Sequence, residues 1–337
     1  MSADADRIEL EHGGGGRLTR DFIDAEIVSR FGDGALAGLP DAALLARPET
    51  PIVFTTDSFV VQPLEFPGGN IGDLAVHGTV NDLAVSGGRP RWLSLALVIE
   101  EGLRLEVLRR VLDAVKRAAD ACGVTVVTGD TKVVARGQCD GLYVNTAGIG
   151  ELMTGFRLGP ERVSAGDHVL VSGPIAEHGF AVMACRENIH IENAPRSDTA
   201  AVYGLVEALD AIAGGIHRMR DPTRGGLAAV LNEFVEGRRF GITLQEESIP
   251  LSAGGRAVAE LLGLDPLHVA SEGRLLLVCE EDLSDAILER WRALPEGSGA
   301  ARIGSVDDHA GRVIMQTVTG GRRLVDVPRG ELLPRIC

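Results

Sequence analysis

Hydrophobic and polar positions in the first half of the chain predict strands and helices in alternation. Between positions 103 and 121, Leu108, Leu112 and Val115 recur at spacings of three and four, which is the period of a helix with one buried face. Segment 72–86 carries small apolar residues and predicts a second helix. Short apolar runs predict strands at 52–57, 91–99, 124–128 and 142–149.

The second half repeats this alternation after a stretch that is rich in turn signals. Residues 158–174, LGPERVSAGDHVLVSGP, contain Gly-Pro and Ala-Gly-Asp, which are typical of turns and mark a domain boundary. One predicted helix, 198–213, places Val202, Leu205, Leu209 and Ile212 on one face. The other elements predicted here are strands at 168–172, 274–279, 311–318 and 322–327, and helices directly after 224–226 and at 282–294.

These patterns predict a mixed α/β (α+β) protein of two domains, because strands and helices mix in both halves. We expect a glycine-rich N-terminal arm over 1–50, a first domain over 51–157 and a second, α/β domain over 158–327. The last ten residues, 328–337, hold two prolines and show no periodicity. They predict an extended, mobile tail that ends in Cys337.

Composition and charge narrow the functional classes. The net charge of −15 argues against a nucleic-acid partner, which calls for a basic surface. No apolar run approaches the roughly 20 residues of a membrane span, and the N-terminus lacks the pattern of a secretory signal, so we expect a cytoplasmic protein with no membrane partner. The five cysteines show no CxxC spacing, which argues against disulfides and a zinc site.

Acidic residues next to apolar segments are the first candidate site. Asp57 ends the strand 52–57, Asp82 lies in the helix 72–86, and Asp130 follows the strand 124–128. Carboxylates on separate elements can converge on a hard cation such as Mg²⁺. The alternative is that each is a helix cap or turn residue, as Asp often is. Neighbouring polar or glycine positions that share the motifs are Asn81, Gly129 and Lys132.

Two glycine-rich segments are candidates for phosphate binding. In the segment 219–228, Asp221-Pro222 forms a turn, and Thr223, Arg224, Gly225 and Gly226 open a helix, whose first N–H groups can bind an anion. The alternative is an ordinary glycine-rich helix start. Near the N-terminus, His12 precedes four glycines that include Gly14 and Gly15, and these form either a ligand-wrapping loop or a flexible arm.

Glu272 and Cys337 complete the candidates. Glu272, in the segment Ser-Glu-Gly before an apolar strand, is either a general base, a metal ligand or a plain turn carboxylate. Cys337 closes the segment Pro-Arg-Ile-Cys and is not part of a prenylation signal, since the cysteine stands last. It is either a reactive thiol or an incidental surface cysteine.

These motifs occur together, in this order, in a known family. The chain resembles the HypE family, the carbamoyl dehydratases of [NiFe]-hydrogenase maturation, which belong to the superfamily of aminoimidazole ribonucleotide synthetase and selenophosphate synthetase. The resemblance covers essentially the whole chain, and the closing PRIC is its most specific motif. The motifs that carry it are HGGGG, TTDSFVV, GNIGDLAVHGTVNDLAVSGGRP, GDTKVV, RDPTRGGLA, SEG and PRIC.

The resemblance implies a fold and a pair of cofactors. It implies that 51–157 binds ATP and dimerises, with a four-stranded sheet that forms a barrel across a homodimer. ATP and Mg²⁺ would lie between the domains, with Asp57, Asp82 and Asp221 at metal positions and Asp130 in a matching motif. Asn81, Gly129, Asp130 and the two glycine-rich segments would bind the cofactor. Asn70 stands where selenophosphate synthetases carry a further Asp, which puts its ligand role in doubt.

The resemblance also implies a reaction. HypF would load a carbamoyl group onto Cys337, ATP-dependent dehydration would turn the thiocarboxamide into a thiocyanate, and the cyano group would pass to iron on a HypC–HypD complex. Lys132 and Glu272 are the candidates for charge stabilisation and proton transfer. The alternatives are a small-molecule ATP phosphotransferase of the same superfamily and a non-catalytic maturation scaffold.

Overall fold

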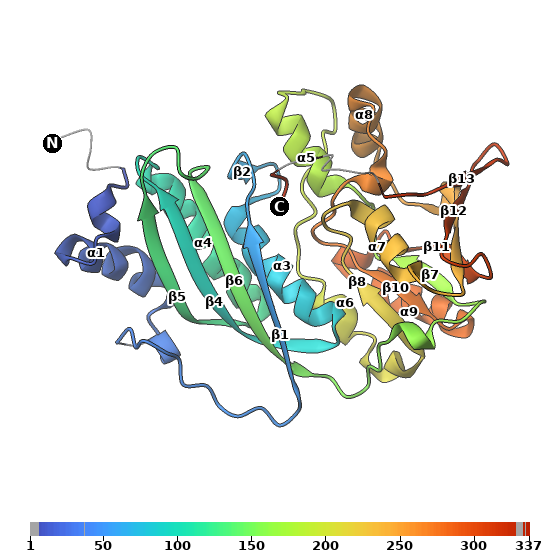
Figure 1. Cartoon of the computed structure of the whole chain (residues 1–337), viewed down its shortest axis with the longest axis horizontal. Coiled ribbons are helices and arrows are strands. Elements are labelled where there is room, and N and C mark those ends of the chain that lie inside the picture. The colour runs from blue at the N-terminus through green and yellow to red at the C-terminus, as the bar shows by residue number, and fades with distance from the viewer. Residues whose placement is uncertain (1–6, 37, 328–332, 334) are drawn as a thin grey trace.

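Four strands of the first domain form a sheet in the order β1-β6-β4-β5, with α3 and α4 packed on one face (Figure 1). The computed structural model describes residues 7–36, 38–327, 333 and 335–337. Neighbouring strands are antiparallel except for β4 and β5. The bounds are β1 Ile52–Phe59, α3 Ile71–Val85, β4 Gly88–Glu100, α4 Leu105–Cys122, β5 Thr125–Val134 and β6 Leu142–Leu152.

Side-chain alternation explains why the helices cover only one face of this sheet. Leu93, Leu95, Leu97 and Ile99 of β4 are buried beneath α3 and α4, while the residues between them are only partly covered. The opposite face carries aromatic and aliphatic side chains, and Phe54 on it is 65% exposed. The first domain therefore has one packed face and one open face.

The remaining elements of the first half are short. The N-terminal segments pack beside α4 and β5, and the hairpin β2–β3 leads into α3. Asn70 caps α3, since its Oδ1 accepts from the Gly72 N–H at 2.8 Å. The bounds are η1 Leu10–Gly13, α1 Arg17–Phe22, η2 Ile23–Val28, α2 Ser29–Phe31, η3 Gly34–Leu36, β2 Glu65–Phe66 and β3 Gly69–Asn70.

The second domain is a seven-stranded sheet in the order β13-β12-β9-β11-β7-β10-β8, with helices packed against it (Figure 1). Its strands are β7 His168–Val171, β8 Ile216–Arg220, β9 Gly241–Gln245, β10 Leu276–Cys279, β11 Ala301–Asp307, β12 Val313–Gln316 and β13 Arg322–Leu324. Its α-helices are α5 Glu177–Arg186, α6 Tyr203–Glu207, α7 Gly226–Val235, α8 Ala253–Leu262 and α9 Ser284–Arg292. The 3₁₀ turns are η4 Pro160–Arg162, η5 Asp210–Gly215, η6 Glu246–Ser248, η7 Pro266–His268, η8 Glu281–Leu283 and η9 Pro295–Gly297.

The predicted mixed α/β architecture is confirmed, with corrections to single elements. The helix predicted at 198–213 is wrong: 198–202 has no regular secondary structure, α6 is short, and η5 follows. Val202, Leu205 and Leu209 are nevertheless buried as expected. Asp57 and Asp130 lie inside β1 and β5 rather than at or beyond their ends. These strands run on because β6 and β4 continue to pair with them.

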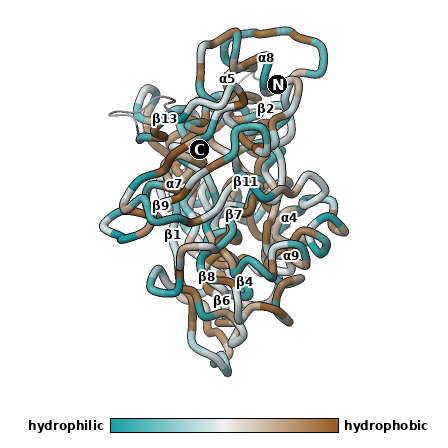
Figure 2. Tube along the Cα trace, turned by 90° about the vertical axis from the view of Figure 1, so that its right-hand side faces the viewer, coloured by the Kyte–Doolittle hydropathy of each residue, from teal (hydrophilic) through white to brown (hydrophobic). Residues whose placement is uncertain are grey.

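The hydrophobic residues are spread in short stretches over both domains (Figure 2). None of the helices in the described part of the chain combines the length and the apolarity that a bilayer crossing requires. The predicted mobile tail, 328–337, lies partly outside the described residues, which lack 328–332 and 334. Its described residues, Leu333 and Arg335–Cys337, are called the C-terminal segment below; the last of them lie between the two domains, near β2 and α5 (Figure 1).

Candidate functional site

A polar cavity between the two domains collects most of the predicted acidic residues. Its volume is about 160 Å³. The first domain contributes β1 and α3, and the second contributes the loop after β8 and the loop before β10. The residues that line it are Asp57, Ser58, Phe59, Gly78, Asp82, Asp221, Thr223, Arg224, Glu272 and Cys337.

Strand pairing explains why the second domain brings Asp221 and Glu272 together. β8 and β10 are antiparallel neighbours, and Arg220 at the end of β8 pairs with Leu276 at the start of β10. The loop after β8 and the loop before β10 therefore leave the same edge of the sheet. The Ser271 N–H donates to the Pro222 carbonyl at 3.0 Å and joins the two loops.

Two glycines allow these loops to pack closely. Gly226 at the start of α7 has φ +62°, and a Cβ there would lie 2.6 Å from the Leu267 carbonyl oxygen. At Gly273 a Cβ would lie 1.8 Å from the Asp198 carbonyl oxygen. A side chain at either position would displace the loop. The glycines of RDPTRGGLA and SEG thus position Arg224 and Glu272.

The first domain holds its two carboxylates by local hydrogen bonds. The Thr55 hydroxyl donates to Asp82 Oδ2 at 2.8 Å, from β1 to α3. The Ser58 N–H donates to Asp57 Oδ1 at 2.7 Å. Asp57 and Thr55 share the face of β1 that is turned toward α3, because they are two residues apart.

The carboxylates of the cavity are buried together in a region of low dielectric constant. Not every one of them has a positively charged group beside it. Burial raises the pKa of Asp221 to about 7, and the neighbouring Asp82 adds to this. Burial, followed by the charge of Asp221, raises the pKa of Glu272 well above its usual range. Burial also raises the pKa values of Asp57 and Asp82. The buried Oε1 of Glu272 has no hydrogen-bond partner among the described residues.

This donor set fits a divalent cation such as Mg²⁺. Carboxylate oxygens are its preferred protein ligands, and its charge would offset the repulsion that raises these pKa values. Within the described residues, no three carboxylate, imidazole or thiol groups form one ready-made coordination sphere. Mg²⁺ is compatible with such a site, because it usually keeps several waters and takes only one or two protein carboxylates.

Cys337 lies at the same cavity, beside the buried carboxylate. Its thiol lies beside Glu272 and the Arg224 guanidinium, and all three groups line the cavity. Burial, followed by the charge of Glu272, raises the pKa of the thiol far above its usual range. The sulfur is therefore a neutral thiol here. A group attached to it would lie beside Glu272 and Arg224.

The other predicted site residues lie on the β5 side of the first domain. Gly129 and Asp130 line a separate cavity of about 230 Å³ under the N-terminal segments. Alternation puts Asp130 and Lys132 on the open face, with Ala96 and Val98 of β4. β5 is three strands from β1, so Asp130 is roughly 14 Å across the sheet from Asp57. Gly14 and Gly15 belong to the adjoining N-terminal segment, at the end of η1.

Asn81 connects the two domains and does not face the cavity. It is 1% exposed, and its Nδ2 donates to the carbonyls of Ala200 at 3.0 Å and Glu272 at 3.2 Å. Its Oδ1 accepts from the Val202 N–H at 2.7 Å. These bonds occupy the amide that was predicted to bind the cofactor. They also hold the main chain of Glu272 against α3.

Replacing Asn81 by Ala should lower the free energy of unfolding by about 2–4 kcal/mol, because three buried backbone groups lose their partner. Urea unfolding measures this loss. Ser86→Ala, at the exposed end of the same helix, is the control and should change little. A variant with unaltered unfolding but weaker ATP binding would instead assign Asn81 to the nucleotide.

Sequence reasoning missed two residues that support the site. Asp198 Oδ1 accepts from the Glu272 N–H and from the His178 N–H, both at 3.1 Å, and Oδ2 lies 3.3 Å from Arg274 Nε. Thr55 was not singled out either. No periodicity or local motif marks these positions, because their partners lie far away in the sequence.

Both halves of the chain match known domain families. Residues 40–152 match the N-terminal domain of AIR synthase related proteins, and residues 164–316 match the C-terminal domain of the same proteins. Carbamoyl dehydratase HypE of Rhodobacter capsulatus is 46% identical over 341 residues, which is 100% of each chain.

Solved structures give the same result at the level of the fold. A hydrogenase maturation protein HypE in complex with ATP has a TM-score of 0.93 and 41% identity, covering 97% of this chain and 99% of that one. A HypE–HypF complex contains a chain with a TM-score of 0.80 and 41% identity, covering 93% of this chain and 100% of that one. The relatives therefore match both domains and the connection between them.

Proposed function

The chain belongs to the HypE family of AIR synthase related proteins, and we propose that it dehydrates a carbamoyl group carried on Cys337. The product is a thiocyanate on the same sulfur, which supplies cyanide ligands to the iron of [NiFe]-hydrogenase. The observation that carries the proposal is the place of Cys337. Its sulfur lies in a cavity of carboxylates, in contact with Glu272 and Arg224.

The reaction needs a leaving group and a base. ATP, when bound, supplies a phosphoryl group that turns the amide oxygen into a good leaving group, with Mg²⁺ offsetting the charge. In balance, the S–C(=O)NH₂ group loses its oxygen and both N–H protons and becomes S–C≡N, while ATP becomes ADP and phosphate.

Glu272 has the position and the environment of the base. Its carboxylate touches the sulfur that carries the amide, and its raised pKa makes the ionised form a stronger proton acceptor. Arg224 approaches the same sulfur and can offset charge that develops on the departing oxygen. Of Asp57, Asp82 and Asp221, one or two would bind the cation directly and the rest would bind it through its waters.

A homodimer would give a role to the open face of the first domain. Exposed Phe54 and Ile52 lie on that face, and burying them against a second copy would stabilise the pair. We propose that two such sheets face each other as a barrel. Asp130 and Lys132 would then lie at the interface, where Lys132 can serve a nucleotide phosphate.

We propose the partners and the location on separate grounds. A HypE has been solved with HypF, and we propose HypF as the carbamoyl donor and a HypC–HypD complex as the cyanide acceptor. All five cysteines, each within the described residues, carry free thiols. Free thiols fit the reducing cytoplasm.

Mass spectrometry of the C-terminal peptide tests the reaction. After HypF has loaded Cys337, addition of Mg-ATP should remove the mass of one water from that peptide, and omission of ATP should leave it unchanged. Cys337→Ala should prevent loading and keep ATP binding. A protein that binds ATP and carries the carbamoyl group, yet never loses water, would contradict the proposal. Loss of phosphate from ATP to a small molecule, independent of Cys337, would support a phosphotransferase instead.

A further inference from the structure

The C-terminal segment is held mainly through its backbone carbonyl groups. The Arg335 carbonyl accepts from the Gln62 N–H at 3.2 Å and from Arg186 Nη2 at 2.8 Å. The Ile336 carbonyl accepts from His178 Nε2 at 2.6 Å. Both acceptors directly precede Cys337, so these bonds determine where the sulfur lies.

His178 is built to donate one hydrogen bond in a single direction. It is 0% exposed and stands edge-on to Phe66, with ring centroids 5.2 Å apart. Its Nδ1 lies 2.8 Å from the Ser197 hydroxyl, which itself accepts from the Thr199 N–H. The Ile336 carbonyl can only accept, so the ring proton sits on Nε2. In the neutral ring Nδ1 then accepts from the Ser197 hydroxyl. Burial lowers the pKa of His178, which keeps the ring neutral.

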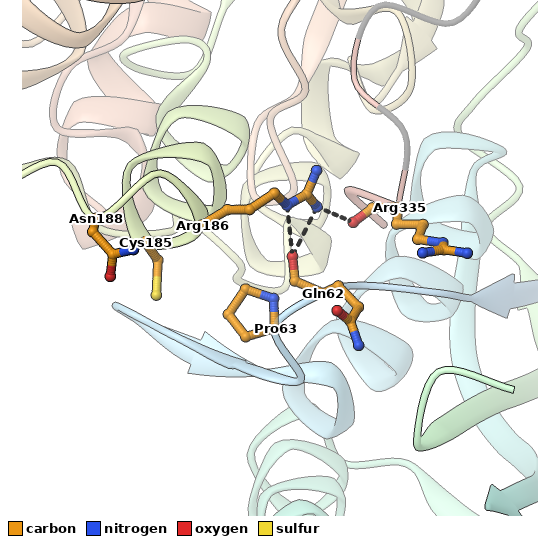
Figure 3. Close-up of a pocket in the computed structure, with 6 residues that line it drawn as sticks. All are labelled: Gln62, Pro63, Cys185, Arg186, Asn188 and Arg335. Atoms are coloured by element: carbon orange, nitrogen blue, oxygen red, sulfur yellow. Dashed lines mark hydrogen bonds between the residues drawn. The ribbon is translucent and has the colours of Figure 1, made fainter. Parts of the chain in front are cut away.

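Arg186 joins the two domains to the C-terminal segment (Figure 3). It comes from the end of α5 and lies in a groove of about 640 Å³ that Gln62, Pro63, Cys185, Asn188 and Arg335 also line. Its Nε and Nη2 donate to the Gln62 carbonyl at 3.2 and 2.7 Å, in addition to the Arg335 bond. The guanidinium of Arg186, at the end of α5, thus joins the loop between β1 and β2 to the C-terminal segment.

A side-chain ion pair completes the contact. Arg335 Nε lies 3.0 Å from Asp140 Oδ2, in the turn between β5 and β6. Arg335 has φ +55°, a backbone conformation that non-glycine residues rarely adopt. The hydrogen bonds to the Arg335 carbonyl and the ion pair of its side chain hold the residue in this conformation.

We propose that His178 and Arg186 are positioning residues, which dock the C-terminal segment by its Arg335 and Ile336 carbonyls and so place the Cys337 sulfur against Glu272. His178 and Arg186 together are called the docking slot. Because their hydrogen bonds go to the main chain, the docking slot holds the segment whether the sulfur is free or carries a group. The strength of docking therefore sets the fraction of molecules whose thiol lies in the cavity and the fraction whose thiol lies at the surface, where a partner enzyme can reach it. Docking does not depend on the proposed function; only its effect on turnover does.

Alkylation of Cys337 tests the slot without any substrate. A docked thiol reacts slowly, because its pKa is raised, whereas a free thiol at pH 8 is partly ionised. Losing one or two hydrogen bonds should free the segment, so His178→Ala and Arg186→Met should each speed iodoacetamide labelling of the C-terminal peptide by roughly 5- to 10-fold. His178→Gln, whose side-chain N–H replaces Nε2–H, should label close to the wild-type rate.

Two controls separate docking from folding. Cys279, which is 0% exposed in β10, labels only if the second domain opens, so its labelling must stay at the wild-type level. Arg196→Met removes an exposed arginine of the neighbouring segment and should leave Cys337 protected. If His178→Ala also speeds the labelling of Cys279, that variant has opened the second domain, and only the result for Arg186→Met tests the proposal. Unchanged Cys337 labelling in Arg186→Met, with Cys279 protected, would overturn the proposal.

A single-turnover measurement then links docking to chemistry. With HypF-loaded protein and saturating Mg-ATP, water loss should slow in Arg186→Met and recover in His178→Gln relative to His178→Ala. Faster labelling without slower water loss would keep the slot and reject its role in turnover. An absence of water loss in the wild-type protein would refute the proposed function while leaving the labelling result intact.

Discussion

Exchanging Glu272 for Gln is expected to slow water loss from the carbamoylated Cys337 by about 10²- to 10⁴-fold, the usual contribution of a positioned general base. Gln keeps the shape of the side chain but cannot accept the N–H protons that must leave the amide. The buried position of this side chain disfavours a charge, which is why the pKa of the carboxyl group is raised. The uncharged amide of Gln costs less there than an ionised carboxylate does. The measurement is the single-turnover rate of water loss, followed on the C-terminal peptide.

The matched control for this exchange is Glu281→Gln, an exposed carboxylate in η8 of the same domain. Its rate should equal that of the wild type. Loading by HypF and binding of ATP should survive Glu272→Gln, since neither needs this proton transfer. If Glu272→Gln retains the full rate, the base is another group.

Exchanging Asp221 for Asn should stabilise the cation-free protein at pH 8 while abolishing its cation-dependent activity. The folded-state pKa of Asp221, about 7, lies above its ordinary value of 3.8. Its contribution to stability is therefore fully present below about pH 4 and is lost as the pH rises through 7. At pH 8 the ionised carboxylate costs up to about 4 kcal/mol, at 1.36 kcal/mol per pKa unit. Asn avoids this cost.

Thermal unfolding in EDTA at pH 5 and pH 8 measures this effect. The variant should unfold at a higher temperature than the wild type at pH 8, and the difference should shrink at pH 5. Adding MgCl₂ at pH 8 should raise the Tm of the wild type and have much less effect on Asp221→Asn. Asp308→Asn, an exposed exchange, should behave as the wild type throughout. A variant that is less stable than the wild type at pH 8 in EDTA would contradict the raised pKa.

The sequence predicted the parts of the site that depend on local pattern. The helical period of α4 and the apolar run of β4 depend on neighbours within a few residues. The glycines around Arg224 and Glu272 stand out as local motifs, although the neighbours that require them, Leu267 and Asp198, lie far away in the sequence. The motifs also led to the HypE family, which the comparisons confirm. The helix expected at 198–213 failed for the opposite reason. Its first residues form no regular element and bond to Asn81, a long-range partner that the helical period cannot reveal.

The candidate residues divided in a way that local pattern could not foresee. Asp57 and Asp130 looked alike in the sequence, since each sat at the end of an apolar run. In the fold they lie on opposite faces and opposite edges of one sheet, because strand order and alternation decide these places. Asn81 and Asp82 are adjacent, yet Asn81 faces the second domain and Asp82 faces the cavity.

What the sequence by itself determined is therefore the set of elements, the family and the chemical types at the site, since propensity, period and motif are local properties of the chain. Only the tertiary structure decided which carboxylates share a cavity, how far their pKa values rise, and that His178 and Arg186 meet the carbonyls beside Cys337. These outcomes depend on burial and on contacts between residues more than 100 positions apart. Such contacts exist only once the two domains have packed against each other.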